Sequence, residues 1–289
     1  MGYALGVDLG TTYTAAATVR DGRSEIANLG NRAAAIPSVV LLRDDEQVLT
    51  GEAASRRGLS EPDRVAREFK RRVGDTNPIF LGGAPYSAEA LMARLLRWVV
   101  DEVSARQGGP PDALAVSHPA NWGQYKKDLL EQAVRLADLA SATYLTEPEA
   151  AAIHYSSQER VEPGDVVAVY DLGGGTFDAA VLRKTPEGFE ILGTPEGVER
   201  LGGIDFDAAV YHHVATHVGA ALTQLDQDDP AAIQAGARLR QECVEAKEAL
   251  SVDTDVSIPV LLPNTQTEVR LTRTEFESMI RPSLGDSIR

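Results

Sequence analysis

The chain has 289 residues, a formal net charge of −15 at pH 7 and a single cysteine, Cys243. This length suits about two domains, and the acidic balance argues against nucleic-acid binding, because phosphate backbones require basic surfaces. No stretch approaches the ~18 apolar residues of a membrane span, and the first residues lack the pattern of a signal peptide. We therefore expect a cytoplasmic protein with no membrane partner and no internal disulfide.

The first half of the chain predicts a β-rich start. Runs of apolar residues predict its strands, and Asp21-Gly22 predicts a hairpin turn between two of them. We expect the strands near residues 3–7, 14–19, 24–29 and 36–41.

Helices follow this β-rich start. Ser87 predicts the N-cap of a helix that runs to about residue 105, because apolar residues between Leu91 and Val99 recur at the spacing of a buried face. Residues 113–116 predict a strand, and residues 125–139 predict an amphipathic helix. The order is three strands and then helix, strand and helix.

The second half begins in the same way. A strand is expected near residues 166–170, and hairpin strands near 177–182 and 189–192. A long helical region follows from about residue 205 to 251, interrupted by a polar turn at 226–230. The repeated order predicts an α/β fold built from two similar halves.

Two near-copies of one motif mark these halves. Asp8-Leu9-Gly10-Thr11-Thr12 and Asp171-Leu172-Gly173-Gly174-Gly175-Thr176 each follow an apolar strand. Glycine turns bring backbone N–H groups close to an anion, threonine hydroxyls add donors, and an aspartate at a strand end can hold a metal through water. The motifs therefore predict a polyphosphate gripped from both sides. The alternative is that both are ordinary glycine-rich hairpins.

The residues after each motif exclude two other phosphate loops. In P-loop and dinucleotide folds the glycines lead into a helix, whereas here each motif leads into a further strand. A phosphate held between two hairpins resembles the arrangement in the actin-like ATPase superfamily. Because Asp8, Glu147 and Asp171 would face that phosphate, we expect an intervening cation, and Mg²⁺ is the usual one.

Five motifs, in order, resemble the seventy-kilodalton heat-shock (DnaK-type) chaperones. They are Gly6-Val7-Asp8-Leu9-Gly10-Thr11-Thr12-Tyr13, Phe69-Lys70-Arg71-Arg72-Val73-Gly74, Glu147-Pro148-Glu149-Ala150-Ala151-Ala152, Asp171-Leu172-Gly173-Gly174-Gly175-Thr176-Phe177-Asp178 and Leu201-Gly202-Gly203-Ile204-Asp205-Phe206-Asp207.

The resemblance implies a duplicated actin-like ATPase (ribonuclease H-like) fold, with two lobes around a central nucleotide cleft. Lobe I would span residues 1–165, with a reduced outer subdomain at about 43–110. Lobe II would span 166–289, with a helical outer subdomain at about 205–280. The chain stops before the family's remaining lobe II strands, linker and substrate-binding β-domain, so we expect an incomplete second lobe and weakened nucleotide binding.

The resemblance also assigns roles around the phosphates. The backbone amides of residues 10–13 and 173–176 would hold the β- and γ-phosphates of ATP or ADP. Asp8 and Asp171 would orient Mg²⁺ through its water shell, with K⁺ a further candidate cation. Lys70 would place the attacking water, with Glu147 and Thr176 nearby. Taken alone, Lys70 could instead belong to a solvated basic run and Glu147 could be a helix-start residue, while Asp178 could cap or pair locally.

Adenosine contacts follow from the same resemblance. Gly202 and Gly203 would approach the α-phosphate and ribose, and Lys247 and Ser251 match the family's adenosine-contacting helix. The family's ribose-binding glutamate falls at Val244, so Glu245 or Glu242 would have to replace it.

Another departure concerns coupling between domains. The family's switch proline corresponds to Pro119, but the arginine expected eight residues later is Lys127. Lysine cannot reproduce a planar bidentate contact, so we expect altered coupling between the domains.

The resemblance predicts an ATP-binding and ATP-hydrolysing domain, a Mg-dependent switch that serves protein folding and the stress response. In the full-length protein its partners would be unfolded client peptides, a J-domain co-chaperone and a nucleotide-exchange factor. The alternatives are a small-molecule kinase of the same superfamily and an actin-like filament protein.

Overall fold

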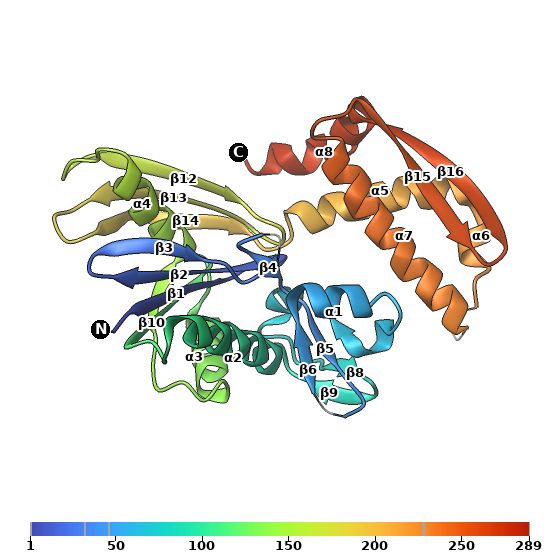
Figure 1. The fold of residues 1–289 in the computed structure, drawn as a ribbon. Helices are drawn as coiled ribbons and strands as arrows, with labels where there is room; N and C mark the ends of the chain where they lie inside the picture. Colours follow the sequence, from blue (N-terminus) through green and yellow to red (C-terminus); the bar gives the residue numbers. More distant parts are fainter. Residues whose placement is uncertain (1, 32, 46, 227–228, 289) are drawn as a thin grey trace. The chain divides into compact units, whose positions relative to one another are not determined.

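The structure, a computed structural model, describes residues 2–31, 33–45, 47–226 and 229–288. The chain forms two compact units (Figure 1). One contains Met1–Arg56 and Asp63–Glu199, and the other contains Arg57–Pro62 and Arg200–Arg289. The compact units do not divide at residue 165, because the sheet formed by residues 166–198 groups with the first unit. The division into two lobes at that point stays a prediction.

A mixed sheet forms the base of the first unit. Its order is β11-β10-β1-β2-β3, and the short strand β4 pairs with β2. Strand β1 runs parallel to β10 and antiparallel to β2. The strands are β1 (Ala4–Leu9), β2 (Tyr13–Arg20), β3 (Arg23–Ala27), β4 (Ile36–Pro37), β10 (Ala113–His118) and β11 (Thr143–Thr146).

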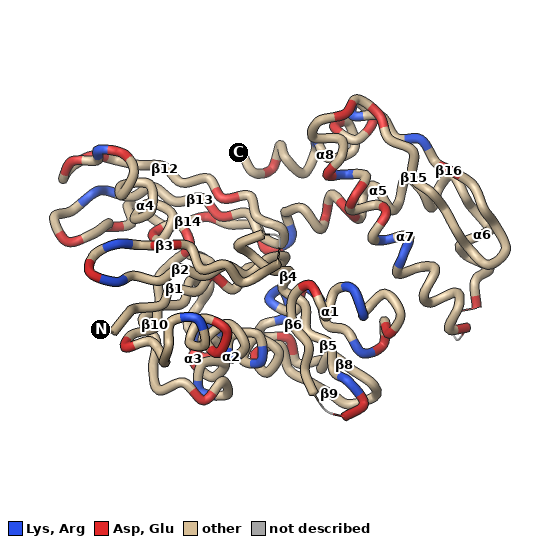
Figure 2. Tube along the Cα trace, viewed as in Figure 1, with Lys and Arg blue, Asp and Glu red and all other residues tan. Residues whose placement is uncertain are grey.

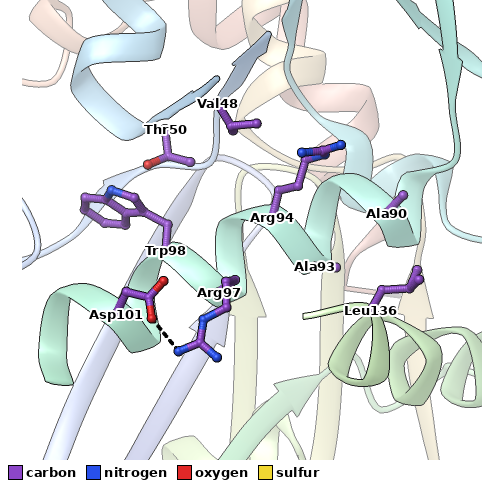
Figure 3. A pocket seen from close by; sticks show the side chains of 9 residues that line it. All are labelled: Val48, Thr50, Ala90, Ala93, Arg94, Arg97, Trp98, Asp101 and Leu136. Atoms are coloured by element: carbon purple, nitrogen blue, oxygen red, sulfur yellow. Dashed lines mark hydrogen bonds and ion pairs between the residues drawn. The ribbon is translucent and has the colours of Figure 1, made fainter. Parts of the chain in front are cut away.

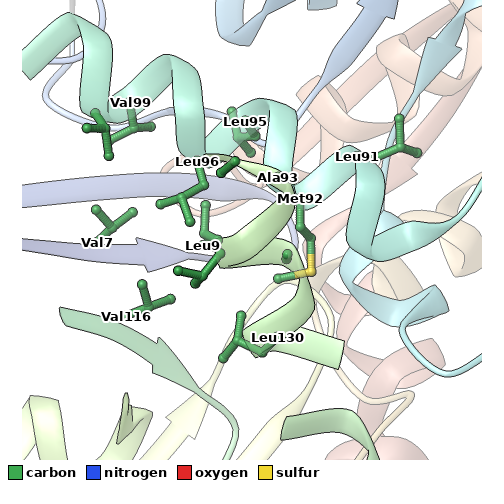
Figure 4. Close-up of a cluster of buried hydrophobic side chains, with 14 of the residues drawn as sticks. Val7, Leu9, Leu91, Met92, Ala93, Leu95, Leu96, Val99, Val116 and Leu130 are labelled. Atoms are coloured by element: carbon green, nitrogen blue, oxygen red, sulfur yellow. The ribbon is translucent and has the colours of Figure 1, made fainter. Parts of the chain in front are cut away.

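Two helices of this unit bury the main core. Helix α2 (Ala88–Gln107) begins where predicted, since the Ser87 side chain accepts a hydrogen bond from the N–H of Ala90. Helix α3 (Gln124–Leu136) packs beside it. Leu91, Leu95 and Val99 of α2 belong to one buried cluster with apolar side chains of β1 and β10 (Figure 4). The repeat of apolar residues that predicted the helix is therefore its buried face.

The strand predicted at residues 36–41 is wrong as a single element. Residues 36–37 pair with β2, whereas β5 (Val40–Leu42) pairs with β6 (Val48–Thr50) and β7 (Val65–Ala66) in a different sheet. The chain changes sheets at Ser38, whose N–H donates to the carbonyl of Thr12. An apolar run alone does not reveal such a change of partner.

Smaller elements complete the outer part of this unit. They are α1 (Gly51–Arg57), the 3₁₀ helices η1 (Pro62–Arg64) and η2 (Phe69–Arg72), and the paired strands β8 (Ile79–Leu81) and β9 (Ala84–Tyr86).

A second, antiparallel sheet belongs to the same unit. It contains β12 (Val166–Leu172), β13 (Phe177–Lys184) and β14 (Phe189–Val198) in that order. Helix α4 (Glu147–Gln158) packs against it, with Ala152, Ala180 and Leu182 buried between them. Both strand–loop–strand motifs thus lie in one compact unit.

The second unit has its own core of helices and a two-stranded sheet. Its elements are α5 (Gly203–Val218), α6 (Ala220–Thr223), α7 (Pro230–Ala249), β15 (Asp255–Leu262), β16 (Thr265–Thr272) and α8 (Arg273–Asp286).

The expected long helical region is therefore three helices, and the segment expected to be helical to about residue 280 also contains a hairpin. Ile258, Val260 and Leu262 are buried at alternate positions, which is the period of a strand. The polar turn predicted at 226–230 includes residues 227 and 228, which lie outside the described residues; Asp229 caps α7.

Lys and Arg positions are interspersed with Asp and Glu positions along both units (Figure 2). No helix in the described part of the chain is long and apolar enough to cross a membrane.

Candidate functional site

The first glycine loop joins β1 to β2 and is held from one side by Ser38. The Ser38 hydroxyl donates to the carbonyl of Gly10 at 2.7 Å, and its N–H donates to the carbonyl of Thr12 at 2.8 Å. Since that hydroxyl proton is used, the Thr14 hydroxyl donates to Ser38 Oγ at 2.8 Å. Both side chains are buried. A neutral hydrogen-bond network therefore fixes the backbone of this loop.

The second glycine loop joins β12 to β13 and is held by an arginine. Gly173 N–H donates to the carbonyl of Thr176 at 2.9 Å, which closes a tight hairpin. Arg71 donates to the carbonyl of Gly175 from Nε at 2.9 Å and from Nη2 at 2.7 Å. A charged group from a remote short helix therefore supports this loop.

The two loops touch one another. A Cβ atom on Gly174 would lie 1.7 Å from Thr12 Oγ1, and one on Gly175 would lie 2.4 Å from Thr11 Oγ1. Contacts this short are not tolerated, so the approach of the loops requires glycine at both positions. The structure thus brings the two predicted phosphate loops together.

Lys70 and Glu147 form a buried ion pair beside the loops. Lys70 Nζ lies 2.6 Å from Glu147 Oε1, and their side chains are 7% and 14% exposed. Lys70 lies in η2, and Glu147 is the first residue of α4. Glu147 is therefore both a helix-start residue and a partner of Lys70. Burial alone would lower the pKa of Lys70, but Glu147 and then Asp8 raise it above its usual value. Lys70 is therefore a buried cation and does not belong to a solvated face.

Three more carboxylates surround this pair. Asp8 accepts a hydrogen bond from the Ser117 hydroxyl at 2.7 Å. Burial raises the pKa of Asp171, and the charges of Glu147 and Asp8 raise it further. Asp178 is opposite Asp171 in the β12–β13 register and is 1% exposed. Burial, followed by the charge of Glu147, raises the pKa of Asp178 to about 6.

This arrangement fits a cation. Asp8, Glu147 and Asp171 repel one another, and Asp178 Oδ1 is buried without a hydrogen-bond partner. A hydrated Mg²⁺ would relieve that repulsion and supply donors through its waters. Among the described residues, no group of three His, Cys, Asp or Glu side chains could hold a metal directly.

Two cavities of this unit differ in chemistry. One of about 480 Å³ has Asp8, Glu147 and Asp171 among walls that are otherwise mainly apolar. The other, of about 450 Å³, lies between β6, α2 and the end of α3 and contains none of the predicted site residues (Figure 3). Its Arg97 pairs with Asp101 at 2.5 Å. The carboxylate-lined cavity is therefore the one that coincides with the predicted site.

The predicted adenosine residues lie in the second unit. Lys247 Nζ lies 2.7 Å from Asp207 Oδ1 and donates to the carbonyl of Gly203 at 3.2 Å, so it ties α7 to the start of α5. Gly202 is the N-cap of α5. Glu245 is exposed and accepts a hydrogen bond from Gln241, and Ser251 is exposed beyond the end of α7. The structure joins Gly203 to Lys247 and does not bring Glu245 or Ser251 into that contact.

Sequence reasoning missed three residues that hold the site. Ser38 and Ser117 carry no motif signal, because a serine is common in any strand or loop. Arg71 lies inside the basic run that surrounds Lys70. Its motif position next to Lys70 was the one available signal.

The two glycine–threonine loops face each other beside a buried Lys–Glu pair, and sheets and helices of a mixed α/β architecture carry them. These features are those of an actin-like ATPase fold. The chain belongs to the Hsp70 family: the family model described as "Hsp70 protein" matches residues 4–80 and 76–288.

Curated relatives agree with this assignment. The "Chaperone protein DnaK" of Elusimicrobium minutum is 31% identical, over 96% of this chain and 46% of the relative. The "Chaperone protein HscA homolog" of Methylobacillus flagellatus is 32% identical, over 99% of this chain and 47% of the relative. The DnaK of Thermotoga petrophila is 31% identical, over 96% and 47%. The chain thus spans about half the length of the curated relatives that it matches.

Proposed function

We propose that this chain is the ATP-binding and ATP-hydrolysing part of a DnaK-type chaperone. The observation that carries the proposal is the buried Lys70–Glu147 pair beside two glycine loops that touch one another. A buried ion pair is weak evidence of stabilisation, and a charged group with a shifted pKa beside a cavity is a candidate for a functional site. Membership of the Hsp70 family supports the same conclusion.

The chain's own residues would act by positioning. Backbone N–H groups of residues 10–13 and 173–176, together with the hydroxyls of Thr11, Thr12 and Thr176, would bind the β- and γ-phosphates. Lys70, held as a cation by Glu147, would orient the attacking water and offset charge on the γ-phosphate. Burial of Lys70 strengthens these interactions, because water does not screen them.

Mg²⁺ is the cation that this proposal requires, with K⁺ as a further candidate. Asp8 and Asp171 would hold Mg²⁺ through its water shell, and the ion would supply neutralisation of the phosphate charge. Gly202, Gly203, Lys247, Ser251 and Glu245 remain the proposed adenosine contacts.

The remaining partners are also proposed. In a full-length protein these would be unfolded client peptides, a J-domain co-chaperone and a nucleotide-exchange factor. The name "Chaperone protein DnaK" of the relatives supports the chaperone part of this proposal. A cytoplasmic location belongs to the same proposal, and cell fractionation with an antibody to this chain tests it.

The test combines binding and turnover. Calorimetry with Mg-ATP and Mg-ADP should give binding, and phosphate release should occur in buffer alone, which separates hydrolysis from transfer to an acceptor. Lys70→Ala should lower turnover by about 10²–10³ fold, the usual loss for one charge-stabilising contact, while sparing much of the binding.

Lys184→Ala is the matched control. Lys184 lies at the end of β13, with its Nζ 4.8 Å from the ring centroid of Phe189. Its replacement by alanine should leave turnover unchanged. Circular dichroism must show that both variants are folded. Failure of the wild-type chain to bind Mg-nucleotide at millimolar concentration, or normal turnover by Lys70→Ala, would contradict the proposal.

A further inference from the structure

Arg71 occupies an unusual position relative to the second glycine loop. Both Nε and Nη2 of its guanidinium donate to one oxygen, the carbonyl of Gly175, at 2.9 and 2.7 Å. Gly175 lies at the tip of the hairpin and is buried. The contact joins residues that are 104 positions apart in the chain. The loop tip is therefore tied to a distant element and not only to its own strands.

This contact fixes the direction of a backbone donor. The peptide between Gly175 and Thr176 is planar and trans, so its C=O and N–H point in opposite directions. When Arg71 holds the carbonyl, the N–H of Thr176 must point away from Arg71. Glycine residues would otherwise let this peptide turn over easily, because Gly174 and Gly175 have no Cβ to restrict it.

The element that carries Arg71 also carries Lys70. Both are in η2, which spans only Phe69–Arg72. Lys70 is held by Glu147, and Arg71 holds Gly175, so one short turn sets the place of the buried cation and the orientation of the loop peptide. The backbone of this one turn therefore carries both groups.

We infer that Arg71 is a positioning residue for the second phosphate loop, which it keeps in an orientation that can bind anions. The inference rests on the proposed nucleotide function. Arg71 itself need not touch the nucleotide; it acts through the Gly175–Thr176 peptide. A tie that only adds stability is the competing explanation, and it predicts no specific effect on the loop.

Arg72 provides a matched control. It is the next residue of η2, but its guanidinium pairs with Asp75 and donates to the carbonyl of Asn77, both on the same local segment. Arg72→Gln therefore removes an arginine from the same helix without touching the loop. Arg71→Gln removes the charge and the fork, and Arg71→Lys keeps the charge but can place only a point donor near the carbonyl.

The first readout is hydrogen exchange of peptides that cover residues 171–178 in the nucleotide-free protein. Arg71→Gln should accelerate exchange there, whereas a peptide from β15–β16 should exchange as in wild type. Arg72→Gln should match wild type in both. Equal acceleration in both peptides, or none in the loop, would overturn the inference.

The second readout is Mg-ATP and Mg-ADP affinity by calorimetry, with KM and kcat for hydrolysis. Loss of a hydrogen bond from a charged group should weaken both affinities about tenfold in Arg71→Gln, with KM rising by a similar factor and kcat changing less. Arg71→Lys should recover part of the loss. Wild-type affinity in Arg71→Gln would overturn the inference.

The two proposals fail differently. If the wild-type chain binds no nucleotide, the proposed function fails, and hydrogen exchange alone still decides whether Arg71 orders the loop. If wild type and Arg72→Gln bind nucleotide while Arg71→Gln binds equally well, only the role of Arg71 fails.

Discussion

The two glycine loops are near-copies in sequence but are supported in different ways. The first is held by neutral hydroxyls, with Ser38 bonded to Gly10 across 28 positions. The second is held by the charged fork of Arg71 across 104 positions. A repeated motif therefore fixes the local turn, while the residues that stiffen each turn are supplied separately by the surrounding fold.

The strands that flank the loops also differ at one matched position. Asp8 is opposite Ala15 in the β1–β2 register, whereas Asp171 is opposite Asp178 in the β12–β13 register. Like charges across a strand pair are destabilising. Burial and the charge of Glu147 are the main causes of the raised pKa of Asp178, and the charge of Asp171 raises it further. The second loop thus carries an extra carboxylate where the first carries a methyl group.

The largest expected effect breaks the contact between the loops. Gly175→Ala places a methyl group against Thr11 and should lower the free energy of unfolding by about 3 kcal/mol, the upper range for overpacking. Urea unfolding measures the change. Gly188→Ala, at a hairpin where a Cβ meets nothing within 4 Å, should stay close to wild type. Equal stability of the two variants would contradict the observed contact.

A smaller effect comes from the extra carboxylate. The folded-state pKa of Asp178 is raised from 3.8 to about 6, so its contribution to stability is greatest below about pH 4 and is lost as pH rises through 6. Asp178→Asn should therefore stabilise the protein at pH 8 by about 2 kcal/mol and change little at low pH. Urea midpoints at pH 4 and pH 8 measure this. A pH-independent difference between variant and wild type would argue against titration of Asp178.

The smallest effect concerns the neutral support of the first loop. Ser38→Ala removes the hydrogen bond to the carbonyl of Gly10 and should cost about 1 kcal/mol of stability. Hydrogen exchange should rise in residues 9–14 and remain unchanged in residues 171–178. The reverse pattern is expected for Arg71→Gln, so the pair of variants tests whether the supports are separate. Exchange that rises in both loops for both variants would show that they are one unit.

The elements that the sequence predicted best are those whose buried face is continuous along the chain. Helix α2, with Ser87 as its cap, and the hairpin strands around both motifs are of this kind. The break at Ser38 was missed, because a change of sheet depends on which strands are neighbours in space. The hairpin β15–β16 was missed because it follows a long helical pattern.

The residues of the candidate site also fall into two groups, those that sequence motifs predicted and those that only the tertiary structure revealed. Motifs named Asp8, Lys70, Glu147, Asp171 and the loop glycines, and the structure places them within one unit. Ser38, Ser117 and Arg71 act through single long-range hydrogen bonds, which leave no periodic or compositional trace. Their roles depend on tertiary structure and could not be read from spacing.

Cys243 gives the second unit a built-in kinetic reporter. It is the only cysteine of the chain, is 1% exposed within α7, and burial, followed by the charges of Asp207 and Glu242, raises its pKa to about 12. The thiolate that reacts with disulfide reagents is therefore nearly absent while α7 packs against β15. The labelling rate of the native chain will therefore report openings that expose α7, with no engineered probe.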